Sequence, residues 1–361
     1  MAERVYLDYN ATAPLRPEAR LAMLQAMDIV GNPASVHKEG RAAKRIVENA
    51  RRQVAEMVGC QPDEIIFTSG ATEAASILAE LAKTRAIVVQ DTAHDALWVH
   101  NSHQSDAAQD SDGDLVFAMG LANSETGIIT PPPDPEGGRW PLGVGRYADW
   151  LLLDVTQAVG RIPFSFAWSG AQMAILSAHK LGGPKGVGAL VVRRGTDISP
   201  VLKGGGQEMG RRSGTENIVG ISGFGAAAAA SSRDLADGVW ENVAEIRKIL
   251  ESALADGSKD TIFVGYSSNR LPNTSCFALP GWKGETQVMQ MDLAGYAVSA
   301  GSACSSGKVK SSRVLAAMGY GPDVAGAAIR VSLGPGSQRE DVLRFAEVWR
   351  QKAARYRARA A

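Results

Sequence analysis

Short apolar runs alternate with helical patterns through the first two thirds of the chain. Each run is three to six residues long and is predicted to form a strand; the runs lie at residues 65–67, 86–89, 114–119, 150–153, 173–176 and 188–192. The segment 71–83, which follows the first run, is predicted to be a helix. Continuous apolar strands interleaved with helices are typical of a largely parallel sheet covered on both faces. The pattern therefore predicts an α/β fold, in which ligands bind at the carboxyl ends of the strands.

The last third of the chain predicts a second, smaller domain. A long helical segment at about residues 218–254 is expected to link the two parts. Beyond it, strand-like runs and a closing helix alternate as in α+β proteins, at residues 261–264, 276–279 and from Arg339 onward. We therefore expect a large domain over residues 15–235 and a small domain that combines residues 1–14 with residues 236–361.

Composition narrows the class of protein. The 361 residues are enough for two domains with a substantial core. The 38 Lys and Arg residues balance 38 Asp and Glu residues, which excludes a strongly basic nucleic-acid-binding protein. Three cysteines argue against a disulfide-stapled secreted fold and for a reducing compartment. Because the N-terminal residues lack the apolar core of a signal peptide and no apolar run approaches about 20 residues, we expect a cytoplasmic protein without a membrane span.

In the segment Phe67–Glu73, with the sequence FTSGATE, a glycine lies between a predicted strand and a predicted helix, and Thr72 lies in the first turn of that helix. Free N–H groups and the dipole at the start of a helix suit a phosphate group. An ordinary helix cap is the alternative, because Ser and Thr are frequent at helix starts in any protein. On its own, the segment leaves both interpretations open.

Two charged residues follow other predicted strands. Asp154 comes directly after residues 151–153, where a carboxylate needs a positive partner, either a structural arginine or a protonated pyridine nitrogen. Lys180 follows the run 173–176; a low dielectric would depress its pKa and let it form a Schiff base, although most lysines are solvated surface charges. A phosphate anchor, a pyridinium partner and a reactive amine are together the parts that pyridoxal phosphate requires. Nucleotide binding is the weaker alternative, because the chain has no Walker-type GxxxxGK[ST] sequence.

These segments resemble the pyridoxal-phosphate-dependent cysteine desulfurases of the NifS/IscS type, in the class V aminotransferase superfamily. The resemblance spans nearly the whole chain, and its motifs, in chain order, are YLDYNATAPLRP, HKEGRAAK, FTSGATE, AHDA, NSETG, DVTQAVGRIP, LSAHKLGGPKGVGALVVRR, GGGQEMGRRSGTEN, SAGSACSSG and IRVSLG. It implies a fold-type-I enzyme with pyridoxal 5′-phosphate as cofactor, L-cysteine as substrate, and a homodimer with active sites near the subunit interface.

The resemblance also implies roles for individual residues. Lys180 would form the Schiff base with the cofactor, Asp154 would contact the pyridine nitrogen, and Gln157 would donate to the ring hydroxyl oxygen. The phosphate group would be bound by four residues of one subunit and one of the other, namely Ala71, Thr72, Ser177 and His179 with Thr215.

Further roles are implied for residues around the substrate. His94 would stack on the cofactor ring and transfer protons. Arg330, in IRVSLG, would bind the α-carboxylate, a task suited to a planar guanidinium. Asn123 is assigned to the substrate and Ser124 to the cofactor, although the family usually has Asn at the position of Ser124.

Cys304, in the motif SAGSACSSG, would distinguish a desulfurase from its aminotransferase relatives. Glycines and serines surround it, which predicts a polar loop that swings between the cofactor and an outside acceptor. The alternative is a small residue without chemical function in a flexible loop. The other two cysteines, Cys60 and Cys276, are predicted to be buried small hydrophobic residues. No metal site is predicted from His100 and His103, because two ligands in a polar loop are too few.

The implied reaction removes sulfur from L-cysteine and leaves L-alanine and a persulfide on Cys304. Lys180 would be the base for the Cα proton, and a sulfur-acceptor protein would collect the persulfide for iron–sulfur cluster assembly or thiolation. A class V aminotransferase or a selenocysteine lyase is the nearest alternative, and a degenerate fold that only binds a partner protein is the second. Two further departures from the family, Ala93 in place of an acid and a short segment 95–122, are expected to affect substrate entry and partner docking.

Overall fold

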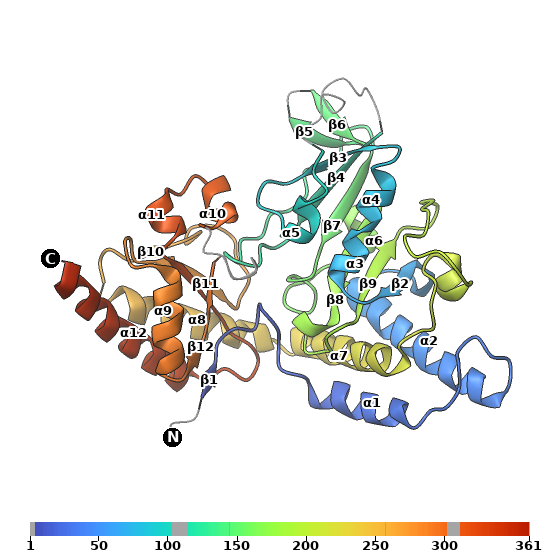
Figure 1. Cartoon of the computed structure of the whole chain (residues 1–361), viewed down its shortest axis with the longest axis horizontal. Helices are drawn as coiled ribbons and strands as arrows, with labels where there is room; N and C mark the ends of the chain where they lie inside the picture. The colour runs from blue at the N-terminus through green and yellow to red at the C-terminus, as the bar shows by residue number, and fades with distance from the viewer. Residues whose placement is uncertain (1–3, 103–113, 144, 257, 302–310, 361) are drawn as a thin grey trace. The chain divides into compact units, whose positions relative to one another are not determined.

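The computed structural model describes residues 4–102, 114–143, 145–256, 258–301 and 311–360 (Figure 1). The chain divides into two compact units. Unit 1 consists of Met1–Ala13, Asn123–Ile129 and Ala236–Ala361. Unit 2 consists of Pro14–Ala122 and Thr130–Leu235.

One short segment departs from the predicted domain boundaries. Residues Asn123–Ile129 fall inside the range predicted for the large domain, yet they belong to unit 1. The reason is backbone pairing within that unit. The N–H of Ile129 donates to the carbonyl of Asn269 at 2.9 Å, and the N–H of Leu271 donates to the carbonyl of Gly127 at 2.8 Å.

Unit 2 is built on a six-stranded sheet in the order β2-β9-β8-β7-β4-β3. The strands are β2 (Ile65–Thr68), β3 (Ala86–Val89), β4 (Leu115–Gly120), β7 (Trp150–Asp154), β8 (Met173–Ser177) and β9 (Gly188–Val192). Five of these six are parallel, and β9 runs opposite to its neighbours β8 and β2. The six predicted apolar runs therefore form one mostly parallel sheet, and the predicted α/β fold is confirmed.

Helices cover both faces of this sheet (Figure 1). On one face, Ile66 packs in a core cluster with residues of α3 (Ala71–Ala75) and α4 (Ile77–Leu81). On the other face, Phe67 packs against Phe224 of α7 (Ile218–Ala236), with ring centroids 6.2 Å apart. Because neighbouring residues of one strand are both buried, the strands are apolar without alternation. Other helical segments of unit 2 are α1 (Pro17–Met27), α2 (Lys38–Val58), α5 (Asp95–Trp98), α6 (Phe166–Ser169), η1 (Pro62–Glu64), η3 (Ala178–Lys180) and η4 (Gln207–Gly210).

Two predicted helices are each divided. The helix predicted over 71–83 is interrupted at Ser76, whose hydroxyl donates to the carbonyl of Glu73 at 2.6 Å and competes with the helical backbone pattern. The long helix predicted at 218–254 is interrupted near Gly238, whose φ of +71° is left-handed, and α8 (Val239–Ala255) begins after it.

The hairpin of β5 (Trp140–Gly143) and β6 (Arg146–Ala148) was not predicted, because its residues show no clear alternation of apolar and polar positions.

Unit 1 contains a four-stranded antiparallel sheet in the order β10-β11-β14-β13 and a parallel pair of β1 with β12. The strands are β1 (Val5–Tyr6), β10 (Ile262–Phe263), β11 (Thr274–Ala278), β12 (Tyr296–Ala297), β13 (Ser299–Ala300) and β14 (Ala328–Ser332). Besides α8, the helices are α9 (Gly284–Leu293), α10 (Arg313–Ala317), α11 (Pro322–Ala325) and α12 (Arg339–Ala360). The strands predicted near 261–264 and 276–279 and the helix from Arg339 are confirmed to within two residues.

Aromatic side chains fill the core of unit 1. Trp349 of α12 lies edge-on to Phe277 of β11, with ring centroids 5.3 Å apart, and both residues are fully buried. The indole N–H of Trp349 donates to Gln287 of α9 at 2.9 Å, so the polar atom of the ring is satisfied inside the core.

Across the described ranges of both units, every helix is too short or too polar to cross a lipid bilayer.

Candidate active site

In unit 2, β2 and β8 end beside the start of β9, and this brings predicted phosphate-binding residues together. Gly188 of β9 faces Thr68 of β2 on one side and Ser177 of β8 on the other. Gly188 has no room for a side chain, because a Cβ there would come within 2.7 Å of the Cα of Gly70. The turn at Gly70 consequently lies near Ser177, and a Cβ built on Gly70 would be 3.9 Å from Ser177 Oγ.

The helix start after this turn offers backbone donors. The first hydrogen bond of α3 runs from the N–H of Ala74 to the carbonyl of Gly70 at 3.1 Å, and the N–H groups of Ala71 and Thr72 precede it without an acceptor in the described part of the chain. The cap residue is Gly70, so an ordinary Ser or Thr cap is not what the structure contains. These N–H groups and the hydroxyl of Ser177 fit the acceptor oxygens of a phosphate group.

The carboxylate of Glu73 belongs to the same helix but is directed to other partners. It accepts the N–H of Ser69 at 2.7 Å and a guanidinium N–H of Arg212 at 2.9 Å. Although burial opposes its ionisation, the hydrogen bonds from Arg212 and Ser69 lower the pKa of Glu73. Glu73 therefore links the turn before α3 to the loop that carries Arg212 and the exposed Thr215.

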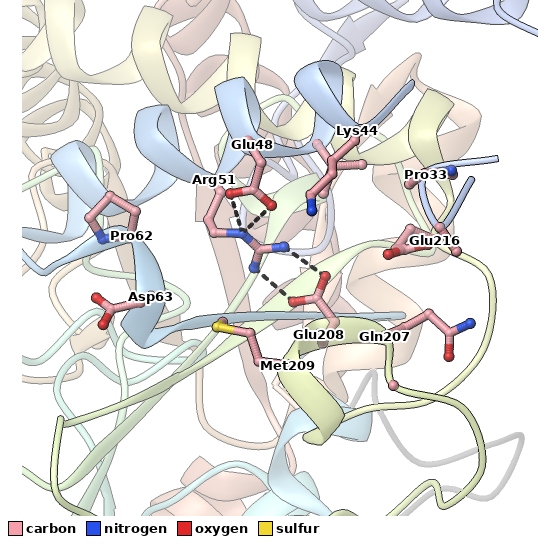
Figure 2. Close-up of a pocket in the computed structure, with 13 residues that line it drawn as sticks. Pro33, Lys44, Glu48, Arg51, Pro62, Asp63, Gln207, Glu208, Met209 and Glu216 are labelled. Carbon is pink, nitrogen blue, oxygen red and sulfur yellow. Dashed lines mark hydrogen bonds and ion pairs between the residues drawn. The ribbon is translucent and has the colours of Figure 1, made fainter. Parts of the chain in front are cut away.

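A buried ion pair anchors the same loop to strand β2. Arg51 of α2 donates to the two carboxylate oxygens of Glu208 at 2.7 and 2.8 Å, and these side chains are only 5% and 2% exposed. Burial opposes the charge of Arg51, but Glu208 and Glu48 raise its pKa. Glu208 also accepts the N–H of Phe67 at 2.9 Å. Figure 2 shows the pair in the wall of a pocket of about 570 Å³ within unit 2.

Asp154 ends β7 without a cationic partner in the described ranges. Its Oδ1 accepts the N–H of Thr156 at 2.9 Å, and no arginine, lysine or histidine described in the structure forms an ion pair with it. The alternative interpretation, in which a structural arginine pairs with this carboxylate, therefore finds no such pair among the described residues. A carboxylate held at a strand end in this way fits a protonated pyridine nitrogen.

Arg161 connects two of the predicted cofactor-binding residues. It donates to the amide oxygen of Gln157 at 2.5 Å and to the backbone carbonyl of Lys180 at 2.8 Å. Lys180 lies in η3, directly after β8. Because the amide oxygen of Gln157 accepts from Arg161, the donor predicted for the ring hydroxyl oxygen is its amide nitrogen.

The pKa of His179 and a hydrogen bond of His94 indicate where these two imidazoles carry their protons. Burial, assisted by neighbouring cations of which Lys180 is the strongest, lowers the pKa of His179 to about 4, so this imidazole is neutral at neutral pH. His94 begins α5, and its Nδ1 accepts the N–H of Ala96 at 3.1 Å. That hydrogen bond assigns the ring proton of His94 to Nε2.

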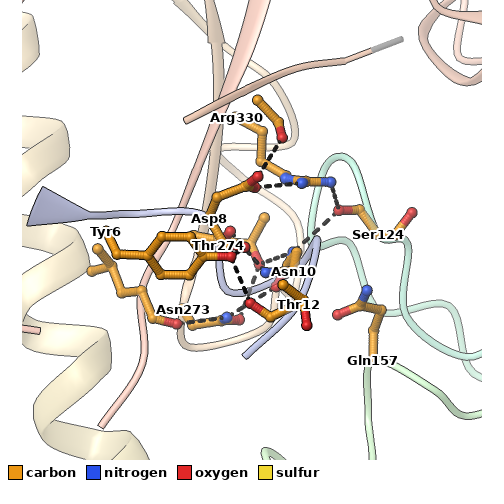
Figure 3. Close-up of polar contacts among 12 residues, drawn as sticks. Tyr6, Asp8, Asn10, Thr12, Ser124, Gln157, Asn273, Thr274 and Arg330 are labelled. Carbon is orange, nitrogen blue, oxygen red and sulfur yellow. Dashed lines mark hydrogen bonds and ion pairs between the residues drawn. The ribbon is translucent and has the colours of Figure 1, made fainter. Parts of the chain in front are cut away.

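Arg330, in β14 of unit 1, is buried and already paired (Figure 3). It donates to the carboxylate of Asp8 at 2.7 Å and to the backbone carbonyl of Ser124 at 2.9 Å. Ser124 is the residue predicted to bind the cofactor, and its backbone carbonyl is the second acceptor of Arg330. The side-chain oxygen of Asn123 accepts two backbone N–H groups of its own turn, each at 2.9 Å. Asp8, for which the sequence predicts no role, is thus the ionic partner of a predicted site residue.

Cys304 and His103 lie outside the described residues. The other two cysteines are poor nucleophiles, because burial raises the pKa of Cys60 to about 12 and also raises the pKa of Cys276. Cys276 is fully buried, as predicted, whereas Cys60 is half-buried.

Two residues without a predicted role support the backbone of unit 2. Arg16 donates to the carbonyl of Leu181 at 2.8 Å and so supports the turn after Lys180. His37 caps α2, because its Nδ1 accepts the N–H of Gly40 at 3.3 Å. Both residues occur in motifs that carry the family resemblance, which was the only sequence signal for them.

Comparisons with known proteins agree with this fold. The aminotransferase class-V family matches residues 5–109 and 144–345, and the chain belongs to that family. Members of the family depend on pyridoxal phosphate, so the predicted family and cofactor are confirmed.

Within this family, the chain is similar to proteins named cysteine desulfurase and to solved NifS-like structures. A protein of Cereibacter sphaeroides named cysteine desulfurase is 39% identical over 96% of this chain and 95% of its own length. A protein of Dictyoglomus turgidum named cysteine desulfurase IscS is 34% identical over 95% of this chain and 92% of its own. Among solved structures, a NifS-like protein has a TM-score of 0.85 at 29% identity and covers 97% of this chain and 99% of its own. The NifS-like protein of Rickettsia africae has a TM-score of 0.82 at 27% identity with the same coverage.

Proposed function

We propose that this chain is a cysteine desulfurase, which removes sulfur from L-cysteine, releases L-alanine and carries the sulfur as a persulfide on Cys304. The observation that carries the proposal is the match to relatives of that name over more than nine tenths of each chain. Two features of unit 2 support it: the donor turn before α3 suits a phosphate, and Asp154 stands at a strand end without a cation in the described ranges.

Residues of unit 2 would hold pyridoxal phosphate. The N–H groups of Ala71 and Thr72 would bind its phosphate, together with the side chains of Ser177 and His179. Asp154 would pair with the ring nitrogen and Gln157 would donate to the ring hydroxyl oxygen, while the amine of Lys180 would attach the cofactor to the chain. When bound, the cofactor draws electrons away from the Cα of the amino acid and stabilises the carbanion there.

Arg330 would hold the α-carboxylate of L-cysteine, since a guanidinium suits a planar anion. Nζ of Lys180 would remove the Cα proton, and Nε2 of His94 would carry protons in other steps. The thiolate of Cys304 then attacks the substrate sulfur. A sulfur–sulfur bond forms, the carbon–sulfur bond breaks, and its electron pair stays with the carbon skeleton, which takes up protons and leaves as alanine.

We infer that two copies of the chain form a homodimer in which Thr215 of each copy reaches the phosphate of the other. Its loop is exposed at Thr215 but is anchored by the ion pairs Arg51–Glu208 and Arg212–Glu73. The persulfide is passed to a sulfur-acceptor protein that serves iron–sulfur cluster assembly or thiolation. The small number of cysteines supports a reducing compartment, the cytoplasm.

The test is to incubate the cofactor-loaded protein with L-cysteine and to measure L-alanine and sulfide, with candidate acceptor proteins added one at a time. We expect one alanine for each sulfur removed. Cys304→Ser should release no alanine and should keep the visible absorbance of the cofactor. Transfer of the amino group to a keto acid would instead support an aminotransferase, alanine from L-selenocysteine alone a lyase, and a colourless protein a scaffold.

A further inference from the structure

Arg330 occupies a central position in the sheet of unit 1. In β14 it faces Cys276 of β11 on one side and Ser299 of β13 on the other. Its side chain is only 7% exposed. A cation at such a position needs fixed acceptors, because burial of an unpaired charge is costly.

Asp8 supplies one of these acceptors, but with a single oxygen (Figure 3). Its Oδ1 accepts from Arg330 at 2.7 Å, whereas its Oδ2 accepts the hydroxyl of Ser299 at 2.7 Å. Ser299 thus engages the oxygen that would complete a bidentate carboxylate–guanidinium pair. The side chain of Asp8 is 15% exposed, so this anion stays close to Arg330 in a mostly dry environment.

The second acceptor, the carbonyl of Ser124, is also fixed. Asn10 donates to it at 3.1 Å and to the hydroxyl of Thr274 at 2.9 Å. Asn273 in turn donates to the amide oxygen of Asn10 at 3.0 Å. Asn10, Asn273 and Thr274 are at most 1% exposed, so the network that supports this carbonyl is inside the core.

The guanidinium nevertheless keeps donors in reserve. It carries five N–H groups, and its contacts with Asp8 and Ser124 engage NH2 and NH1 once each. Nε of Arg330 is buried and has no partner in the described part of the chain, so the donors left for a ligand are the second N–H groups of NH1 and NH2. A second carboxylate can therefore bind the same guanidinium without the departure of Asp8, but it does so against the charge of the first.

We propose that Asp8 is an internal carboxylate that shares Arg330 with the substrate and weakens the binding of the amino acid's carboxylate. The inference rests on the proposed function, in which Arg330 binds that group. Asp8 keeps the guanidinium oriented while no amino acid is bound, and its repulsion of the second carboxylate lets the product leave. Ser299 assists the amino acid, because it keeps Oδ2 of Asp8 away from Arg330.

The test is the affinity of the cofactor-loaded protein for L-alanine, measured by calorimetric titration. Asp8→Asn keeps an oxygen that can accept from Arg330 but removes the charge, so the Kd for L-alanine should fall about fivefold or more. The KM for L-cysteine should fall in parallel, while kcat should not rise. L-alaninamide, which has no carboxylate, should bind Asp8→Asn and the wild type equally.

An unchanged or higher Kd for L-alanine in Asp8→Asn would overturn the proposal, since loss of a merely structural residue does not tighten binding. If this variant does not fold, Ser299→Ala decides. Oδ2 of Asp8 is then released toward Arg330, and the Kd for L-alanine should rise about threefold, whereas an unchanged or lower Kd contradicts the inference. Glu251→Gln is the matched control, because Glu251 pairs with the buried Arg270 at 2.8 Å in the same unit and should leave the Kd unchanged.

The outcomes separate this inference from the proposed function. If the wild type releases alanine from L-cysteine and the Kd does not respond to Asp8→Asn, the inference alone fails. If the wild type releases no alanine, the proposed function fails, and the titration with L-alanine still decides the part played by Asp8.

Discussion

The two units prepare charged side chains for binding in opposite ways. In unit 2, Asp154 stands at the end of a strand with no cation beside it in the described ranges, whereas in unit 1 Arg330 is already paired with Asp8 at 2.7 Å. An unpaired carboxylate gains a complete charge-assisted contact when a cation arrives. A guanidinium that is already paired with one anion gains less interaction free energy from a second anion, because the two anions repel each other. The contrast suits a cofactor that stays bound and an amino acid that exchanges at each turnover.

Of the substitutions considered, removal of the charge at Asp154 is expected to lower activity most. It tests whether this unpaired carboxylate of unit 2 serves the cofactor. Asp154→Asn should lower kcat for alanine release about a thousandfold, because a preorganised charge in an active site is worth that much. The measurement is alanine release at saturating cofactor and L-cysteine. Asp149→Asn is the control, since Asp149 already pairs with Arg139 at 3.0 Å in the same unit and should leave kcat nearly unchanged. A loss of less than threefold in Asp154→Asn would contradict the role assigned to it.

The pair of Arg51 and Glu208 shows what a buried charge contributes to stability alone, because both charges are buried and neither is assigned to a ligand. Glu208→Gln should lower the free energy of unfolding by about 3 kcal/mol, since it leaves the Arg51 charge buried without its partner. Urea unfolding measures the loss. Asp63→Asn breaks an exposed pair with Arg194 and should cost far less. Equal losses in the two variants would show that burial does not set the strength of these pairs.

His179 gives a smaller, pH-dependent effect next to the proposed phosphate site. Its pKa is about 4 in the folded chain against an ordinary value of 6.5, so the unfolded chain binds the proton first as the pH falls. The stability from this residue is complete above pH 6.5 and declines toward pH 4. His179→Asn should therefore remove about 1–2 kcal/mol of the difference in unfolding free energy between pH 7 and pH 5. Identical pH dependence in the variant and the wild type would contradict this pKa.

The sequence predicts the sheet of unit 2 well, because each of its strands is buried on both faces and is therefore apolar throughout. It also singles out Asp154, the last residue of β7, and Lys180, three residues after β8, because charged residues near the ends of such apolar strands are conspicuous. The helix breaks at Ser76 and Gly238 are less visible, because each depends on one local hydrogen bond or one left-handed residue.

The surroundings of Arg330 could not be predicted from local pattern. Asp8 is 322 positions away in the sequence, and the two residues meet only because the N-terminal segment runs beside β14, where Asp8 bridges to Ser332. The carbonyl of Ser124 is a backbone group, so no side-chain type indicates its role. Contacts of this kind depend on tertiary pairing and become visible only in the folded chain.

The most direct test of the proposed persulfide is the mass of the cysteine-containing peptides after a single turnover with L-cysteine. We expect the peptide with Cys304 to gain the mass of one sulfur atom, while the peptides with Cys60 and Cys276, whose thiols have raised pKa values, gain none. Release of alanine without added sulfur on Cys304, or with the sulfur on another cysteine, would contradict it.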